Sequence, residues 1–351
     1  MSTTTMPEAA PPKTLADLRK TLESAYSRLP LDGRPVALVD LPSYLNIGDS
    51  LITLGEFELL KATHPNMKGV YFGSDPSSDV LAQLNNAGGV LLIHGGGNFG
   101  SIWPRHQEFR EHAARTMSNT TIVQLPQSVH FDSPDRLQLS LDVLADHPDF
   151  HIMVRDQASY DQLAPFPLAS LQLMPDSAFA LQLDTPPPAT TDVLVLRRQD
   201  SESQHAGAID EVMRNLSDFS SLSGDWASDA DLPVPWPKAH QTMTRMWSRL
   251  ARRSKSPGLQ RLGWHKLSRA RMELGRRIIS HGRVVLTDRL HVHVQCVLLG
   301  KPHVFFDNSY GKIRGLAEAC GTLGPNAVAA ADAADATEHL RRLLGEAGAT
   351  P

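Results

Sequence analysis

The sequence predicts an α/β fold with two parallel-sheet domains that face a cleft. An apolar strand, a polar turn at its carboxyl end and a helix recur along most of the chain, a pattern typical of parallel α/β sheets. A proline-rich run at 185–188 divides this repeat into two halves. The 351 residues also exceed the roughly 250–300 at which one hydrophobic core stops growing. Ligands of such sheets bind beyond the carboxyl ends of the strands.

The domain boundaries follow from composition. We expect the first domain at residues 15–185 and the second at 189–351, with the proline run as a stiff linker. Residues 1–14 are rich in Thr, Pro and Ala and lack an apolar core, so we expect a disordered N-terminus that is neither a signal peptide nor a membrane span. Residues 236–282 form a basic insertion in the second domain, and we expect it to be helical.

Charge and cysteine content exclude several classes of protein. The formal net charge of −4 gives no reason to expect a nucleic acid as partner. Two cysteines, Cys296 and Cys320, do not make a disulfide framework, so we expect a reduced, cytoplasmic compartment. No stretch approaches the roughly 18 apolar residues that a transmembrane helix needs.

The first domain is expected to begin with an amphipathic helix at 15–29, followed by a buried strand at 35–39. The next helix, at 51–62, is expected to be capped by Asp49 or Ser50, which leaves amide donors facing the preceding loop. Further strands are predicted at 70–73, 89–93, 121–125, 151–154 and 171–174, and helices at 78–85 and 103–117. Polar turns are expected after several of these strands, including Pro126-Gln127-Ser128.

The second domain repeats the same pattern. Its first strand, at 193–196, ends at two arginines, Arg197 and Arg198. Later segments are a strand at 284–287, a helix ending at Leu299, a strand at 303–307, a polar turn at 308–312 that includes Lys312, a strand at 327–331 and a helix at 336–344. Two strands joined by a short helix make a parallel unit, so both polar turns fall on one edge of the sheet.

The turn after the strand at 284–287 carries the sharpest hypothesis about a site. Arg289 stands near the N-terminus of a helix, where the helix dipole disfavours a cation unless an anion is bound there. His291 lies in the same turn, although a histidine near a strand end is more often a hydrogen-bonded core residue. Asp288 is explained equally well as part of such a site and as the N-cap of the helix. Arg197 and Arg198 either reach the same cleft or remain solvated.

The other sequence motifs give weaker support for a functional site, or none. The glycine run at 95–100 formally matches the dinucleotide fingerprint, but no acidic residue follows at the end of the next strand. A tight turn, or a cleft loop that substrate approaches closely, explains it better. His291 and His293 lack the companion ligands of a metal site. No G-x-S-x-G run supports a serine nucleophile.

The basic segment at 236–282 admits two explanations. Thirteen Lys and Arg side chains between residues 238 and 283 are opposed by Glu273 alone, and three tryptophans accompany them. One explanation is a solvated helical hairpin that balances the acidic stretch before it. The other is a surface that faces anionic lipid or a phosphate-bearing lipid carrier.

Seven runs of sequence stand out along the chain: N-I-G-D-S (46–50), H-G-G-G-N-F-G (94–100) with W-P-R-H-Q-E-F-R (103–110), L-P-Q-S (125–128), V-R-D (154–156), P-D-S-A-F-A-L (175–181), D-R-L-H (288–291) and G-K-P-H-V-F-F-D-N-S-Y-G-K (300–312). In this order they resemble the motifs of the polysaccharide pyruvyl transferase family, and most closely the bacterial enzymes that pyruvylate exopolysaccharides. The region 200–280 matches no pattern of the family.

The resemblance implies two Rossmann-like domains similar to the GT-B glycosyltransferases, with the acceptor on the first domain and the donor on the second. It also implies transfer of a pyruvyl group from phosphoenolpyruvate to a sugar of an exopolysaccharide repeat unit, as a ketal that bridges two hydroxyls, with release of phosphate. We expect the acceptor to be linked to polyprenyl diphosphate. We also expect peripheral contact with the cytoplasmic face of the inner membrane.

The resemblance assigns donor binding to Arg197 or Arg198, Arg289, Leu290 and His291, and we add Lys312. Phosphoenolpyruvate carries a phosphate and a carboxylate, both suited to arginine, and its methylene must be protonated, a role that we assign to His291. Candidates for the base are Asp49, His94 and Asp176, and candidates for acceptor binding are Asn46, Gly96, Gly97, Asn98 and Gln127. No metal or further cofactor is required.

Two other functions stay open. The first is a GT-B glycosyltransferase that uses a nucleotide-sugar, although no acidic pair that would hold a ribose stands near the C-terminal end. The second is a degenerate family member that serves as an assembly scaffold, and the intact Arg289 and His291 argue against it.

Overall fold

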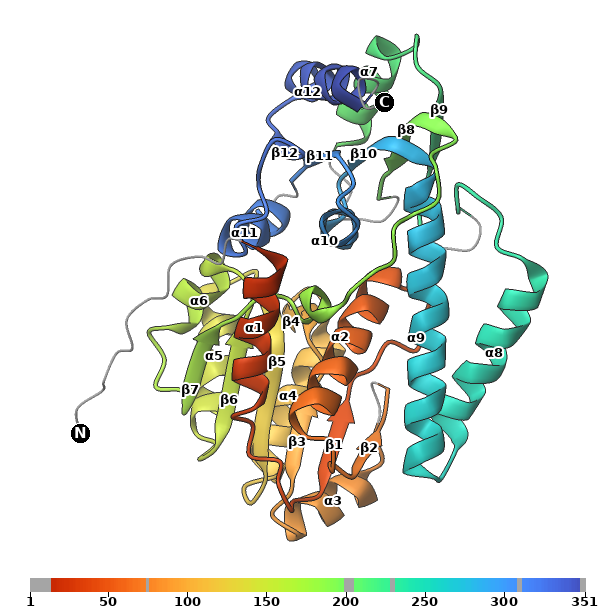
Figure 1. Ribbon diagram of the computed structural model, residues 1–351. Coiled ribbons are helices and arrows are strands. Elements are labelled where there is room, and N and C mark those ends of the chain that lie inside the picture. Colours follow the sequence, from red (N-terminus) through yellow and green to blue (C-terminus); the bar gives the residue numbers. More distant parts are fainter. Residues whose placement is uncertain (1–13, 74–75, 199–204, 228–230, 308–310, 348–351) are drawn as a thin grey trace.

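The computed structural model describes residues 14–73, 76–198, 205–227, 231–307 and 311–347. Two parallel β-sheets lie one above the other in Figure 1, each with helices on its faces. The expected disordered N-terminus lies outside these ranges except for Thr14, whose side chain accepts a hydrogen bond from the backbone N–H of Asp17 and caps the first helix. The turn residues 308–310 lie outside them as well.

The first sheet has the strand order β2-β1-β3-β5-β6-β7, and β4 pairs with β5. Its strands are β1 (Val36–Val39), β2 (Gly69–Tyr71), β3 (Val90–Ile93), β4 (Gly96–Gly100), β5 (Thr121–His130), β6 (Phe150–Val154) and β7 (Ser170–Leu173). All these strand pairs are parallel.

The second sheet has the order β12-β11-β10-β8-β9, again with parallel pairs. Its strands are β8 (Thr191–Leu196), β9 (Ser221–Gly224), β10 (Gly282–Thr287), β11 (His303–Phe306) and β12 (Ala327–Ala330). The predicted α/β fold with two parallel sheets is therefore confirmed.

Both strand orders contain a point at which the direction of winding reverses. In the first sheet the chain moves outward from β1 to β2 and then returns to β3 on the other side of β1. In the second sheet the same reversal separates β8 from β10. The connections leave such neighbouring strands in opposite directions, which opens a crevice at their carboxyl ends. We therefore expect ligands near the ends of β1, β3, β8 and β10.

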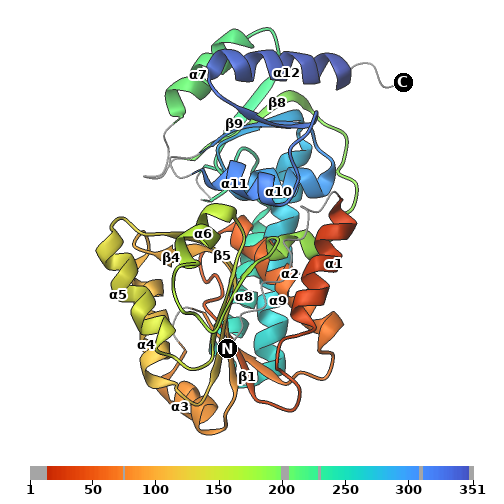
Figure 2. The same ribbon diagram turned by 90° about the vertical axis from the view of Figure 1, so that its left-hand side faces the viewer.

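The helices cover both faces of each sheet, and α10 and α11 lie on the face of the second sheet that is turned toward the first (Figure 2). Around the first sheet are α1 (Leu15–Tyr26), α2 (Ile47–Thr63), α3 (Ser78–Asn86), α4 (Pro104–Thr116), α5 (Pro134–Ala145), α6 (Gln157–Leu163) and the 3-10 helix η1 (Ser177–Ala180). Later in the chain are α7 (Ala206–Asn215), α8 (Lys238–Arg253), α9 (Pro257–Ser280), α10 (Leu290–Leu299), α11 (Lys312–Ala319) and α12 (Ala333–Ala347).

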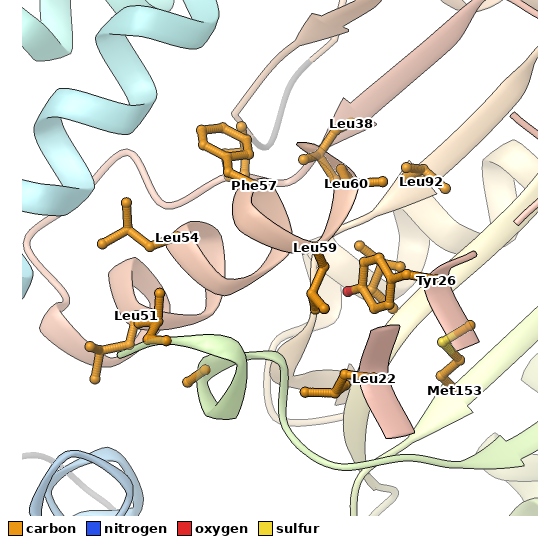
Figure 3. Close-up of a cluster of buried hydrophobic side chains, with 14 of the residues drawn as sticks. Leu22, Tyr26, Leu38, Leu51, Leu54, Phe57, Leu59, Leu60, Leu92 and Met153 are labelled. Carbon is orange, nitrogen blue, oxygen red and sulfur yellow. The ribbon is translucent and has the colours of Figure 1, made fainter. Parts of the chain in front are cut away.

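The largest apolar core lies between α1, α2 and one face of the first sheet (Figure 3). Tyr26 of α1 and Phe57 and Leu60 of α2 are buried there beside strand residues such as Leu38. Burying a side chain of this size contributes about 1.5–3 kcal/mol to folding. This core therefore fixes α2, whose N-terminus enters the ligand crevice.

The basic segment is helical as predicted, since α8 and α9 form a hairpin. Helix α9 packs against elements of both halves of the chain. Trp264 and Leu267 join the core around α2, whereas Leu274 and Ile278 join the core beneath the second sheet. Helix α9 thus ties the two sheets together, and it runs alongside both in Figure 1.

Three local predictions are wrong. Helix α2 begins at Ile47, and its N-cap is Asn46 instead of Asp49 or Ser50, because the Asn46 side chain accepts a hydrogen bond from the Asp49 backbone N–H. The glycine run forms strand β4 instead of a turn. The polar run 126–128 continues β5, because its backbone pairs with β4 and β6.

Candidate functional site

A cavity of about 420 Å³ lies between the two sheets. Its lining comes from the ends of the four strands at the reversal points. Asp40 follows β1 and His94 follows β3, whereas Arg198 follows β8 and Arg289 follows β10. The two crevices therefore face each other across one cleft.

The wall formed by the second sheet is rich in cations. Arg198, Arg289 and Lys312 line it, together with Leu290 and His291. Arg289 is ion-paired with the buried Asp225, which fixes its guanidinium. The fixed guanidinium presents a planar group suited to a phosphate or a carboxylate.

Of the neighbouring arginines Arg197 and Arg198, only the second lines the cleft. Arg197 binds Asp210 on α7 at 2.7 Å and is absent from the cleft lining, whereas Arg198 lines the cleft. The backbone N–H of Arg198 donates to Asp288 Oδ1 at 2.7 Å. Asp288 therefore connects two strand ends instead of capping α10, whose N-cap is Arg289. Burial raises the pKa of Asp288 despite the hydrogen bond from Arg198 and the nearby positive charges.

His291 is held by residues of the other wall. Its Nε2 lies 3.6 Å from Asp176 Oδ2, and the same carboxylate oxygen accepts a hydrogen bond from Arg155 Nη1 at 2.5 Å. Burial alone would raise the pKa of Asp176, but the charge of Arg155 and the interaction with His291 hold it well below its usual range. Asp176 is fully buried and is not among the cleft-lining residues, so it positions its two partners.

Gly48 is the residue of α2 that makes room for His291. A Cβ at this position would lie 2.4 Å from His291 Nδ1. The ring therefore packs directly against the helix backbone, near the first turn of α2. This contact and Asp176 together restrict where the imidazole can lie.

The opposite wall contains a second histidine with a fixed orientation. His94 is buried and contacts Glu56 through Nδ1 at 2.7 Å. Burial lowers the pKa of His94, but the charge and hydrogen bond of Glu56 outweigh it, so the pKa is raised. His94 Nε2 has no hydrogen-bond partner among the described residues, and His94 lines the cleft. A histidine whose orientation and pKa are both set in this way is suited to proton transfer.

Asp49 stands in the first turn of α2 and lines the cleft. Its Oδ2 accepts hydrogen bonds from Asn46 Nδ2 at 2.7 Å and Tyr44 Oη at 3.0 Å. The charge of Asp49, followed by burial, raises the pKa of the Tyr44 hydroxyl, which therefore stays protonated. Asn46 is engaged twice, as helix cap and as donor to Asp49.

The predicted sugar-binding amides are largely occupied by protein partners. Asn98 donates to Asp40 and accepts from Arg110 and Gln127. Gln127 is fully buried and does not line the cleft, so it orients Asn98. Asp40 has φ +67°, a sparsely populated conformation for a residue with a side chain, and its carboxylate binds His106 Nδ1 at 2.7 Å.

The glycines of β4 bring backbone close to the cationic wall. A Cβ at Gly97 would lie 3.3 Å from Arg155 Nη2 and 3.9 Å from Lys312 Nζ. Gly96 has φ +138° and lines the cleft beside Asp49. Both expected glycines therefore lie where the two walls approach each other.

Most of the predicted site residues converge, and three lie outside the lining. His291, Asp49, His94, Arg198, Arg289, Leu290, Lys312, Asn46, Gly96, Gly97 and Asn98 line the cleft, whereas Arg197, Asp176 and Gln127 do not. The sequence reasoning gave no role to Arg155, Glu56 or Asp225. Arg155 directly follows an apolar strand, a signal that could have identified it. Glu56 and Asp225 carry no comparable signal.

Fold and cleft together define an α/β protein with a cationic site between two parallel sheets. The family model for polysaccharide pyruvyl transferase matches residues 46–232 and 251–310, more than half of the chain. The expectation that residues 200–280 match no pattern of the family is therefore wrong except for residues 233–250. The chain belongs to the polysaccharide pyruvyl transferase family.

Two relatives carry the family's name. "Putative pyruvyl transferase EpsO" of Bacillus subtilis is 30% identical over 168 residues, which cover 48% of this chain and 51% of that protein. "Pyruvyl transferase 1" of Schizosaccharomyces pombe is 28% identical over 211 residues, which cover 55% of this chain and 52% of that protein. The alignments thus span about half the length of these relatives.

The fold is also similar to a solved structure. A crystal structure of an uncharacterised protein from Klebsiella pneumoniae aligns with a TM-score of 0.51 at 15% identity, covering 86% of this chain and 93% of the other. This likeness concerns the fold alone. In the described part of the chain, no helix combines the length and the apolar character needed to span a bilayer.

Substitution of Gly48 by alanine tests the contact with His291. The new methyl group overlaps the imidazole, so we expect Gly48→Ala to lower the free energy of unfolding by about 1–3 kcal/mol, the usual size of an overpacking penalty. Urea unfolding measures the loss. Gly207→Ala is the matched control, because a Cβ at Gly207 meets nothing within 4 Å. Equal stability of Gly48→Ala and the wild type would contradict the contact.

The contact between Glu56 and His94 predicts how the pKa of His94 and the stability of the fold respond to a substitution. Glu56→Gln removes the negative charge that raises the pKa of His94, so we expect that pKa to fall. Since the folded pKa is raised, the pair stabilises the fold at low pH, and this contribution is lost as the pH rises through the folded pKa. NMR titration of the imidazole nitrogens measures the shift. The exposed Glu58, changed to Gln, is the control, and an unchanged His94 pKa in Glu56→Gln would refute the coupling.

Proposed function

We propose that the protein transfers the pyruvyl group of phosphoenolpyruvate to a saccharide, forming a ketal and releasing phosphate. The observation that carries this proposal is the position of Arg198, Arg289 and Lys312 on one wall of a cleft that also contains two oriented histidines. Membership of the polysaccharide pyruvyl transferase family and the names of the two relatives support it.

The donor wall suits the charges of phosphoenolpyruvate. The phosphate and the carboxylate each accept hydrogen bonds from a guanidinium in bidentate geometry. Arg289 is fixed by Asp225 and Arg155 by Asp176, so binding would cost little side-chain entropy. We assign donor binding to Arg198, Arg289 and Lys312, with Arg155 as an addition.

The chemistry requires three proton transfers that the two histidines would serve. His291 donates a proton to the methylene carbon of phosphoenolpyruvate, and a sugar hydroxyl adds to the resulting cationic carbon as its own proton leaves. His94, with its raised pKa, accepts that proton. Phosphate then departs with the electrons of its C–O bond, and a second hydroxyl adds and gives its proton to His291, which lost its own in the first step, so the ketal is complete. No further cofactor takes part in this scheme.

The acceptor would lie on the wall formed by the first sheet. Asp49 and the backbone of Gly96 and Gly97 offer acceptors and donors to hydroxyl groups, whereas Asn46 and Asn98 are held by protein partners and would mainly shape the site. We propose a sugar of an exopolysaccharide repeat unit that is linked to a polyprenyl diphosphate.

Titration with phosphoenolpyruvate tests the donor. A ligand stabilises the folded state by RT ln(1 + [L]/Kd), so phosphoenolpyruvate should raise the thermal midpoint of the wild type. Arg198→Gln should weaken that binding about tenfold or more, because one charge-assisted hydrogen bond is lost. The adjacent Arg197→Gln is the control, since Arg197 binds Asp210 outside the cleft. Arg289→Ala is less suitable, because it would leave the buried Asp225 without its ion pair.

Nucleotide-sugars decide between this proposal and the alternative. The same titration is made with a panel of UDP-sugars and GDP-sugars. Stabilisation by a nucleotide-sugar, and none by phosphoenolpyruvate, would identify a glycosyltransferase and make the donor roles wrong. An equal response of Arg198→Gln and Arg197→Gln to phosphoenolpyruvate would remove Arg198 from the donor site.

A lipid-linked acceptor places the enzyme at a membrane surface, and the hairpin of α8 and α9 offers a suitable face. Met243, Met246, Leu259 and Leu262 account for half of the large exposed apolar side chains among the described residues. Exposed basic residues stand beside them, which is the composition of an interfacial helix. We propose peripheral contact of this hairpin with anionic lipid at the cytoplasmic face.

Vesicle binding tests the membrane contact. The double variant Met246→Gln/Leu262→Gln should co-sediment less with vesicles that contain phosphatidylglycerol, because less apolar surface enters the headgroup region. Leu323→Gln, an exposed leucine far from the hairpin in sequence, is the control. Undiminished co-sedimentation of the double variant would exclude the hairpin as the membrane face.

A further inference from the structure

We propose that a second pocket, beside the cleft, holds a phosphate or diphosphate group of the acceptor. This pocket, which we call the arginine pocket, has a volume of about 320 Å³ and lies between α8 and α9. Its cations are Arg245, Arg249 and Arg252 of α8 and Arg271 of α9. The inference rests on the proposed function, because it assigns a class of acceptor to the same site.

The chain places these arginines together by helix geometry. Arg245, Arg249 and Arg252 follow one another at intervals of four and three residues, so they share one face of α8. The buried Arg271 of α9 faces them and donates from Nη1 to the carbonyl of Pro42 at 3.1 Å. Arg245, Arg249 and Arg252 are exposed to solvent, and an anion bound between the four guanidinium groups would reduce their mutual repulsion.

The lining contains no compensating acid. All nine lining residues are basic, apolar or hydroxyl-bearing, with Thr244 and Ser248 as the hydroxyls. Arg245 and Arg249 form no ion pair with any residue in the described ranges. A doubly or triply charged phosphate group would supply a negative charge to Arg245 and Arg249 and accept hydrogen bonds from several guanidiniums at once.

The larger hollow on the other side of the hairpin differs from the arginine pocket in the charge of its lining. It has a volume of about 770 Å³, but four carboxylates line it, from Glu23, Glu58, Asp184 and Glu273. Acids and bases there compensate each other, as in the pair of Arg276 and Glu273 at 2.7 Å. The arginine pocket is therefore the better site for a polyanion.

One residue connects the arginine pocket to the cleft. Leu45 lines both cavities. The positive charge of Arg271 also lowers the pKa of Tyr44, although the charge of Asp49 raises that pKa by more. A saccharide held by its phosphate in the arginine pocket would therefore pass Leu45 and present its hydroxyls to the acceptor wall at Asp49.

Calorimetric titration with inorganic pyrophosphate, in the presence of saturating phosphoenolpyruvate, tests the pocket. Phosphoenolpyruvate occupies the donor wall and prevents pyrophosphate from binding there. We expect Arg245→Gln/Arg249→Gln to bind pyrophosphate at least about tenfold more weakly than the wild type, because two charge-assisted contacts are lost. The affinity for phosphoenolpyruvate should stay unchanged in this variant.

The matched control is Arg253→Gln/Lys255→Gln, which removes two exposed positive charges next to the pocket but outside its lining. It should bind pyrophosphate like the wild type. Equal weakening in both double variants would indicate unspecific attraction and overturn the proposal, as would equal affinity of the wild type and Arg245→Gln/Arg249→Gln. Absence of pyrophosphate binding to the wild type would overturn it too.

Two further probes distinguish the source of the phosphate. Tighter binding of farnesyl diphosphate than of pyrophosphate or UDP would indicate an acceptor on a prenyl carrier. Tighter binding of UDP would indicate an acceptor on a nucleotide. If phosphoenolpyruvate itself fails to bind, the proposed donor falls, while the comparison of the two double variants with pyrophosphate alone still decides the pocket.

Discussion

The cleft depends on one buried carboxylate. Asp176 stands at the start of η1 beside the first sheet. It accepts a hydrogen bond from Arg155 at the end of β6, and its carboxylate lies 3.6 Å from Nε2 of His291 at the start of α10. Charges buried at this depth are tolerated only when they are paired, so the three side chains fix one another. Because the pKa of Asp176 is depressed, the stabilisation is present above the ordinary pKa of a carboxyl group and is lost only as the pH falls through the folded pKa. The position of His291 over the cleft is therefore a consequence of contact between the two sheets.

A similar arrangement recurs at the other polar groups of the cleft. Glu56 orients His94, and Asp225 orients Arg289, each from a buried position that no substrate would reach. Partners behind a functional group hold it in one rotamer, which reduces the entropy lost on binding. The two crevices supply the functional groups, whereas the buried acids determine their directions.

The sequence predicts the alternation of strands and helices because apolar strands and polar turns are local features. It predicts the convergence of His94, Arg198 and Arg289 because the carboxyl ends of parallel strands share an edge. It does not predict the strand order, which depends on contacts between distant segments. The role of Asp176 as a partner of Arg155, the selection of Arg198 over Arg197 and the continuation of β5 through Pro126 depend on such contacts. Gly96–Gly100 formed a strand because β5 offered a pairing edge, and no local propensity indicates it.

The two cationic sites suggest how a neutral sugar could be held for reaction. Hydroxyl groups offer little binding energy in competition with water, so a saccharide is positioned most firmly by a charged group elsewhere in the molecule. The donor wall would hold one anion and the arginine pocket another, with Leu45 and Asp49 between them. Binding energy from that remote phosphate would then orient the hydroxyls toward the donor carbon. The arginines of α8, which lie mostly outside the ranges that the family model matches, would thereby influence which acceptors are used.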